Sequence, residues 1–310
     1  MKTNRPSLSI IVGMYNMTDE IGNTIFSLSP DYQHDVSESE YEVLIVDNGS
    51  NEPLPHDLLR TFPKNVDYNY IDRTSPSPVA AINRAANRAR GQYIGLLIDG
   101  ARISTPGMLS FGLRALAMHD EPVATTITFH IGPDLHRKAI ARGYTKSDER
   151  ALLESIDWRS NPYKLFEVSA PGGSSLYGWF LGVPETSFLF TTAELLKRVG
   201  GLDERFQSPG GGLAMFDLCT RLCSVPDSQL MMLLGEATFH QMHSGAMTGT
   251  TVEESRIRYQ QFKNEYRRIT ESDPARQSWP TILLGHMPDE ASDCLLKSTL
   301  AFKEANSSNE

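Results

Sequence analysis

Two apolar segments of the sequence, residues 9–12 and 43–46, each run into polar residues that could bind a ligand. These polar residues are Tyr15 and Asn16 after the first segment, and Asp47 and Asn48 after the second. A carboxylate only accepts hydrogen bonds, so Asp47 is suited to pair with ribose hydroxyls or with the N–H of a uracil. In the alternative interpretation, the Asp-Asn-Gly sequence at residues 47–49 is only a tight turn.

The segments around these residues predict a βαβ unit. Both apolar runs are β-branched and aliphatic without polar alternation, which is typical of parallel strands covered on both faces. The pattern continues with a helix at residues 77–90, closed by Gly91 as its C-cap, and with a strand at residues 93–98 that ends on Asp99. We therefore expect an α/β fold with a ligand crevice at the strand ends.

These motifs and their order resemble the nucleotide-sugar domain of family-2 glycosyltransferases, which have the GT-A fold. In that family the first strand ends in a pair like Tyr15-Asn16, and the second ends in an acid and a Gly-Ser turn like residues 47–50. In the helix that follows, Asn83 matches the family's Asn, whereas Ile82 replaces its Arg. The turn VGGLDERF at residues 199–206 is among the most specific matches.

The resemblance extends over about residues 7–245. It implies a Rossmann-like, mixed but mostly parallel sheet flanked by helices. It also implies a nucleotide-sugar donor, whose binding residues would be Tyr15, Asn16, Asp47, Asn48, Asn83, Asp99 and Arg102.

A divalent cation, Mn²⁺ or Mg²⁺, is a further implication of the resemblance. The family holds it with an Asp-x-Asp motif, but this chain has Asp-Gly-Ala at residues 99–101 and so keeps one carboxylate. Family members commonly present a histidine late in the chain, and neutral imidazole is a competent ligand for Mn²⁺. We predict Asp99 and His243 as the metal pair, with His240 as the second choice. Arg102 could neutralise phosphate charge directly, or it could be a surface arginine.

The general base is the main departure from the family. Most members begin the acceptor-side helix with Glu-Asp, but Ala214 and Met215 occupy those positions here. Glu185 is the first candidate to replace the base, because it precedes a strand at the crevice. Asp217, one turn along the helix, is the second, although it could instead pair with Arg221 at a spacing of four residues. Two loop acids, at residues 203–204, are further alternatives.

The acceptor side has weaker signals. Residues 119–178 read as a helical and polar insertion that joins a donor half, residues 1–118, to an acceptor half, residues 119–250. Trp179 could stack on a sugar or could pack in the core. Gly211 and Gly212 precede a helix and could present backbone N–H groups to a ligand, or could act as a hinge.

Composition excludes several functional classes. A net charge of −9 without a basic stripe argues against nucleic acid as a partner. The three cysteines give no disulfide framework, and no segment has the length and hydropathy of a transmembrane helix. We expect a cytoplasmic protein, with peripheral contact at the inner face of the membrane left open. Residues 251–310 read as a C-terminal helical appendage with a disordered tail, available for homodimerisation or acceptor docking.

Together these features predict a glycosyltransferase that moves a sugar from a nucleotide-diphosphate donor to a hydroxyl of a glycan, a glycolipid or a small acceptor, with inversion. Because the second metal acid and the usual base are absent, a catalytically degenerate GT-A domain that binds nucleotide or glycan is the alternative. A nucleotidyltransferase-like enzyme on a related sheet is a third possibility.

Overall fold

The structure, a computed structural model, describes residues 5–72, 75–180, 187–243, 252–275, 277 and 279–307. Its strands are β1 (Leu8–Met14), β2 (Tyr41–Asp47), β3 (Val66–Tyr70), β4 (Tyr93–Leu97), β5 (Arg102–Ser104), β6 (Pro122–Ile131), β7 (Ser169–Pro171), β8 (Phe188–Thr192), β9 (Gln229–His240) and β10 (Thr281–Gly285). They form one sheet in the order β10-β9-β6-β8-β4-β1-β2-β3, with β5 paired to β9 and β7 paired to β6. Along the main path, β8 alone runs antiparallel to its neighbours, β4 and β6. The predicted mixed, mostly parallel sheet is confirmed.

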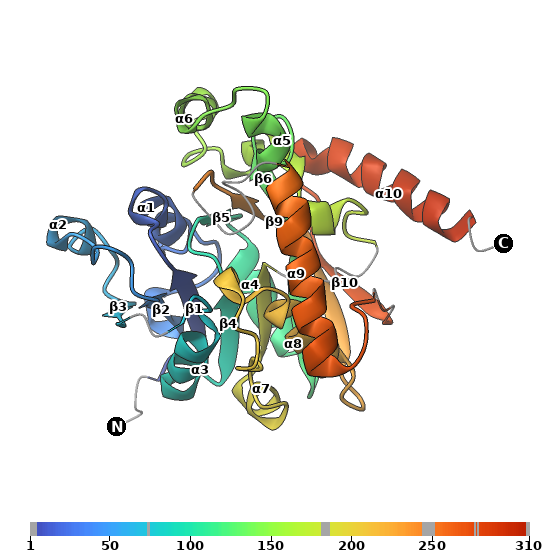
Figure 1. Cartoon of the computed structure of the whole chain (residues 1–310). Coiled ribbons are helices and arrows are strands. Elements are labelled where there is room, and N and C mark those ends of the chain that lie inside the picture. The colour runs from blue at the N-terminus through green and yellow to red at the C-terminus, as the bar shows by residue number, and fades with distance from the viewer. Residues whose placement is uncertain are drawn as a thin grey trace.

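Helices cover both faces of this sheet (Figure 1). The α-helices are α1 (Thr18–Ser27), α2 (His56–Leu59), α3 (Val79–Arg88), α4 (Met108–Leu116), α5 (His136–Ile140), α6 (Lys146–Ser155), α7 (Ala193–Arg198), α8 (Ala214–Cys223), α9 (Val252–Thr270) and α10 (Ser292–Ser307). Short 3₁₀ helices lie at Glu38–Glu40, Pro162–Phe166, Gly173–Ser175, Pro209–Gly211 and Asp289–Ala291. One core lies under α3, α7, α8 and α9, and a second lies under α1, α2 and α4.

The first strand shows why its sequence lacks polar alternation. Every residue of β1 is buried. Leu8, Ile10 and Val12 point into the core beneath α1 and α4, whereas Ile11 points into the core beneath α3 and α8. Because neither face meets water, the side chains on both faces are apolar apart from Ser9, whose hydroxyl donates to the buried Glu42 carboxylate. The predicted strands at residues 9–12, 43–46 and 93–98 are confirmed, to within two residues at their ends.

Gly91 has a different role from the predicted one. Helix α3 ends at Arg88 with Ala89 as its C-cap, so Gly91 does not cap the helix. Instead, the chain passes so close to β1 that a Cβ atom at Gly91 would lie 2.6 Å from the backbone nitrogen of Ser9. The backbone N–H of Gly91 donates to the Ser9 hydroxyl at 2.8 Å. Close backbone approach, rather than helix termination, requires glycine here.

Two segments are more integral to the sheet than their sequences indicated. The predicted polar insertion begins with β6, a ten-residue strand that is buried along most of its length. Its three threonines, at residues 125, 126 and 128, bury their hydroxyls, which donate to backbone carbonyls inside the sheet. In the C-terminal segment, α9 packs into a core and β10 pairs in parallel with β9.

Helix α10 alone has the character of an appendage, and it extends away from the body of the molecule in Figure 1. It exposes Leu296 and Leu300. Within the described residues, no helix combines the length and the apolar character that a membrane span requires.

Candidate functional site

A cavity of about 1020 Å³ opens where β1 and β4 end, at the upper limit of the size of ligand pockets. Among its described lining residues, Asp99 is the single carboxylate. The lining also includes four arginines, Arg102, Arg137, Arg256 and Arg258, of which Arg102 pairs with Asp99 and Arg256 pairs with Glu253. The chain as a whole has a net charge of −9, so this cavity concentrates positive charge on an acidic protein. Such a cavity favours an anionic ligand.

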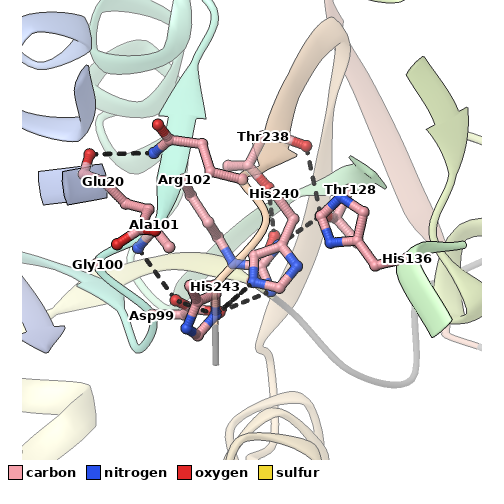
Figure 2. Close-up of polar contacts among 12 residues, drawn as sticks. Glu20, Asp99, Gly100, Ala101, Arg102, Thr128, His136, Thr238, His240 and His243 are labelled. Carbon is pink, nitrogen blue, oxygen red and sulfur yellow. Dashed lines mark hydrogen bonds and ion pairs between the residues drawn. The ribbon is translucent and has the colours of Figure 1, made fainter. Parts of the chain in front are cut away.

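Asp99, His240 and His243, here called the cation group, meet on one wall of the cavity (Figure 2). The Nε2 atom of His240 lies 2.7 Å from Asp99 Oδ2 and 3.0 Å from His243 Nε2. His243 Nε2 is 3.6 Å from Asp99 Oδ1. Ligand atoms around an octahedral ion lie about 3 Å apart when each is ~2.1 Å from the metal. Asp99 and His243 at this separation fit two ligands of a divalent cation such as Mn²⁺, and His240 lies beside them.

Electrostatics places Asp99 and His240 in the protonation states that metal binding needs. Burial of Asp99 would raise its pKa, but His240, His243 and Arg102 outweigh this effect and hold the pKa well below its usual range. Burial lowers the pKa of His240 to about 3, against the opposing attraction of Asp99. Near neutral pH, Asp99 is therefore an anion and His240 is a neutral imidazole, which are the forms that bind a metal.

Cross-strand register brings these side chains together. Arg102 of β5 and His130 of β6 both pair directly with His240, the last residue of β9. The Arg102 guanidinium lies 3.4 Å from Asp99 and donates to Thr128 Oγ1 at 2.6 Å. Arg102 is therefore part of the cavity wall, which settles the alternative of a surface arginine.

Two neighbouring helices fix the segment that carries His240 and His243. The side chain of Gln241 donates to the Glu20 carbonyl oxygen of α1 at 3.1 Å and accepts from Asn23 Nδ2 at 2.9 Å. The backbone N–H of Met242 donates to both carboxyl oxygens of Glu149 on α6, at 3.0 and 2.8 Å. These contacts hold the imidazoles toward Asp99 rather than toward solvent.

The predicted nucleotide residues after β1 and β2 form one interlocked turn. Asp47 is fully buried, and its carboxylate accepts from Ser50 at 2.7 Å and from the Tyr68 hydroxyl at 2.7 Å. Asn16 Oδ1 accepts from the Asn51 backbone at 2.8 Å. Tyr15 and Asn48 line the cavity. Asp47 thus shapes the turn that presents these two residues, and its direct contact with a nucleotide stays a prediction.

Other predicted residues lie away from the cavity. Asn83 is bonded to both backbone groups of Leu202, so it ties α3 to the turn before α8. The carboxylate of Asp217 pairs with Arg221 at 2.7 Å, the ion-pair alternative expected from their spacing. Trp179 is fully buried in the core, with its indole N–H donating to the Glu236 carbonyl oxygen at 3.1 Å.

Of the two glycines, Gly212 lines the cavity and Gly211 is buried. A Cβ atom added at Gly211 would lie 3.5 Å from the side chains of Ile98 and Val79. Glu185, the first candidate for the base, lies outside the described residues. Ala214 and Met215 are buried in the core, in agreement with their apolar character.

Sequence reasoning missed several residues of the cavity wall. They are Thr128, His130, His136 and Arg137 from the supposed insertion, and Arg256 and Arg258 from α9. The basic residues of α9 were visible as a charged helix, but nothing in the sequence showed which side of it faces the cavity. His130 and His136 were hidden in a segment without family motifs.

Glu149, which accepts the Met242 hydrogen bonds, predicts how the stability of the protein depends on pH. Burial raises the pKa of its carboxyl to about 8, which the Met242 hydrogen bonds only partly oppose. The folded state therefore binds more protons than the unfolded chain between about pH 4.5 and 8, and the free energy of unfolding falls as pH rises through this window. Glu149→Gln keeps an acceptor for Met242 and cannot titrate. Urea unfolding at pH 5 and pH 8 should show a decline in wild type, on the order of a few kcal/mol, that the variant lacks. An equal decline in both proteins would contradict this assignment.

A mixed sheet in this strand order, with an electropositive cavity and a cation group at the strand ends, is the GT-A architecture of nucleotide-sugar enzymes. A family model described as glycosyl transferase family 2 matches residues 9–168, more than half of the sequence. The chain belongs to this family, and the resemblance seen in its motifs is confirmed.

Solved structures agree at the level of the fold. A crystal structure of S. aureus TarS has a TM-score of 0.51 at 16% sequence identity, and the match covers 84% of this chain and 40% of that one. A structure of TarS residues 1–349 in complex with UDP-GlcNAc has a TM-score of 0.52 at 14% identity, covering 84% and 66%. This chain thus spans less than two thirds of the length of either structure. No curated protein matches the chain.

Proposed function

We propose that this chain transfers a sugar from a nucleoside-diphosphate donor to a hydroxyl of a glycan, a glycolipid or a small acceptor, with inversion at the transferred carbon. The observation that carries the proposal is the cavity, where one carboxylate, four arginines and the cation group surround the space beyond β1 and β4. A diphosphate needs this combination of positive charge and hard ligands. Family membership supports the same donor class.

Within this proposal, Asp99 and His243 hold the divalent cation, with His240 beside them. A bound Mn²⁺ or Mg²⁺ would neutralise the diphosphate and stabilise it as the leaving group. Arg102 lies 3.4 Å from Asp99, so its guanidinium can add charge on the same side. Tyr15 and Asn48, at the ends of β1 and β2, are placed for the nucleoside.

Glu185 stays our candidate for the general base because of its place in the sequence, just before β8. Asp99 is the single carboxylate on the described cavity wall, and Asp217 is held by Arg221. Glu185→Gln should lower kcat by roughly 10²–10⁴-fold, the usual contribution of a general base. Asp217→Asn is the matched control and should change kcat by less than about tenfold. Steady-state rates of both variants check this, and a large loss in Asp217→Asn alone would reverse the assignment.

The second candidate function is a non-catalytic domain that binds nucleotide or glycan. It is favoured by the buried Ala214 and Met215, which place two apolar residues where most family members have an acid pair. A panel of UDP-, GDP- and dTDP-sugars with Mn²⁺ separates the two functions. Release of the nucleoside diphosphate, by hydrolysis or transfer, supports the enzyme, whereas binding without release supports the degenerate domain. UDP-GlcNAc is the first donor to test, since TarS has been crystallised with it.

A further inference from the structure

Three histidines lie together on the cavity wall beside the cation group. His130 belongs to β6, His136 begins α5 and His240 ends β9, and we call them the imidazole group. All three line the cavity, and one ring nitrogen from each lies within 4.8 Å of the other two. Of these residues, only His240 also belongs to the cation group.

Each ring of the imidazole group has a buried Nδ1 atom without a hydrogen-bond partner among the described residues. His136 Nε2 lies 3.1 Å from the Ile131 carbonyl oxygen, and His240 Nε2 lies 2.7 Å from the Asp99 carboxylate. Both of these oxygens only accept, so each Nε2 carries the hydrogen and each Nδ1 keeps an unshared lone pair. Buried acceptors without a donor are costly, and a cation shared among them would remove that cost.

The ring arrangement also fits one shared ion. The ring centroids are 4.5 Å apart for His130 and His136, 5.2 Å for His130 and His240, and 5.4 Å for His136 and His240. Imidazoles bound to a tetrahedral zinc at ~2.1 Å have centroids about 5 Å apart. The Nε2 atoms of His136 and His240 face acceptors, and Glu149 Oε2 is a further 3.5 Å contact of His136. Metal-binding histidines are usually oriented by carboxylates and carbonyls in this way.

We propose that His130, His136 and His240 form a second metal site, selective for an imidazole-preferring cation such as Zn²⁺ and distinct from the donor cation. Three nitrogen ligands without a carboxylate suit zinc rather than Mg²⁺. Because the group lines the cavity, a fourth position on the ion would face the bound substrates. His240 would use Nδ1 for this ion while its Nε2–H orients Asp99, which leaves Asp99 and His243 for the donor cation. The proposal does not depend on which sugar is transferred.

Zinc binding to the metal-stripped, full-length protein tests this site. Equilibrium dialysis against Zn²⁺ alone, followed by elemental analysis, should give a tight site in wild type and in His243→Ala. His130→Ala and His136→Ala should weaken it by at least about 100-fold, whereas His56→Ala, an exposed histidine on α2, should match wild type. Loss of the zinc in His243→Ala with retention in His130→Ala would place the ion in the cation group and overturn the proposal.

Co²⁺ substitution in wild type gives a readout that does not rely on any variant folding. A tetrahedral site of three imidazoles should give strong visible absorption, because coordination geometry is diagnostic of the ligand set. His130→Gln, which preserves a polar side chain of similar size, should lose this absorption while keeping the far-ultraviolet circular dichroism of wild type. Weak octahedral absorption in wild type, or an unchanged spectrum in His130→Gln, would contradict the assignment.

Discussion

Replacing Asp99 with Asn is expected to lower the rate of donor hydrolysis or transfer by about 10³-fold, the scale on which loss of one preorganised charge-stabilising group acts. The substitution keeps the shape of the side chain and removes its charge. Asp99 is the single carboxylate on the described cavity wall, so no neighbour there can replace it. The Nε2–H of His240 would also lose the anion that accepts from it.

Release of the nucleoside diphosphate at saturating Mn²⁺ measures this effect, with thermal unfolding as the check on folding. Asp57→Asn is the matched control, because Asp57 pairs with Arg60 on the surface and does not line the cavity. A rate for Asp99→Asn within tenfold of that of Asp57→Asn would show that the Asp99 carboxylate does not hold the cation.

Among small substitutions at the N-terminal ends of the central strands, away from the cavity, Gly91→Ala is expected to lower the free energy of unfolding the most. The added Cβ would lie 2.6 Å from Ser9 N, 2.7 Å from Leu8 C and 2.8 Å from Tyr93 O, all backbone atoms that no rotamer change can move. The Ser9 hydroxyl, which accepts from Gly91, also donates to the buried Glu42 carboxylate at 2.6 Å, so a shift would strain a polar network. We expect a loss of about 3 kcal/mol, at the upper end of overpacking costs.

Thermal unfolding should show this as a decrease of roughly 5–10 °C in the melting temperature. Gly22→Ala is the control, since its Cβ would have only Leu58 as a neighbour, at 3.8 Å, and alanine favours helix α1. Equal melting temperatures for the two variants would mean that the chain at Gly91 can move away from β1.

The central strands could be predicted from the sequence because their environment is simple. A strand buried on both faces is mostly apolar, and β1, β2 and β4 follow this rule apart from the hydrogen-bonded Ser9 and Glu42 and from Asp47 at the end of β2. The acidic or amide residue near the C-terminal end of each strand then marks the end of the sheet at which a ligand is expected to bind. The meeting of Asp99 with His240 and His243 came from the family resemblance rather than from these patterns.

The remaining parts of the site depend on contacts that no local pattern encodes. Arg102, His130 and His240 come together because β5 and β6 both pair with β9. β5 and β9 are separated by more than a hundred residues in the sequence. The role of Asn83 was likewise set by a long-range partner, the backbone of Leu202. The pairing of Asp217 with Arg221, in contrast, was visible in the sequence as a spacing of four residues.

Calorimetric titration of wild type with UDP, GDP, dTDP and CMP, each with Mn²⁺ and with chelator, tests the central claim that the cavity holds a nucleoside diphosphate through a cation at Asp99 and His243. The predicted result is tight binding of one diphosphate that requires Mn²⁺ and is lost in His243→Ala. Equal binding in the presence of chelator would mean that Arg102 and the other arginines of the cavity, rather than a cation, bind the phosphates. The absence of binding by every nucleotide would contradict the account.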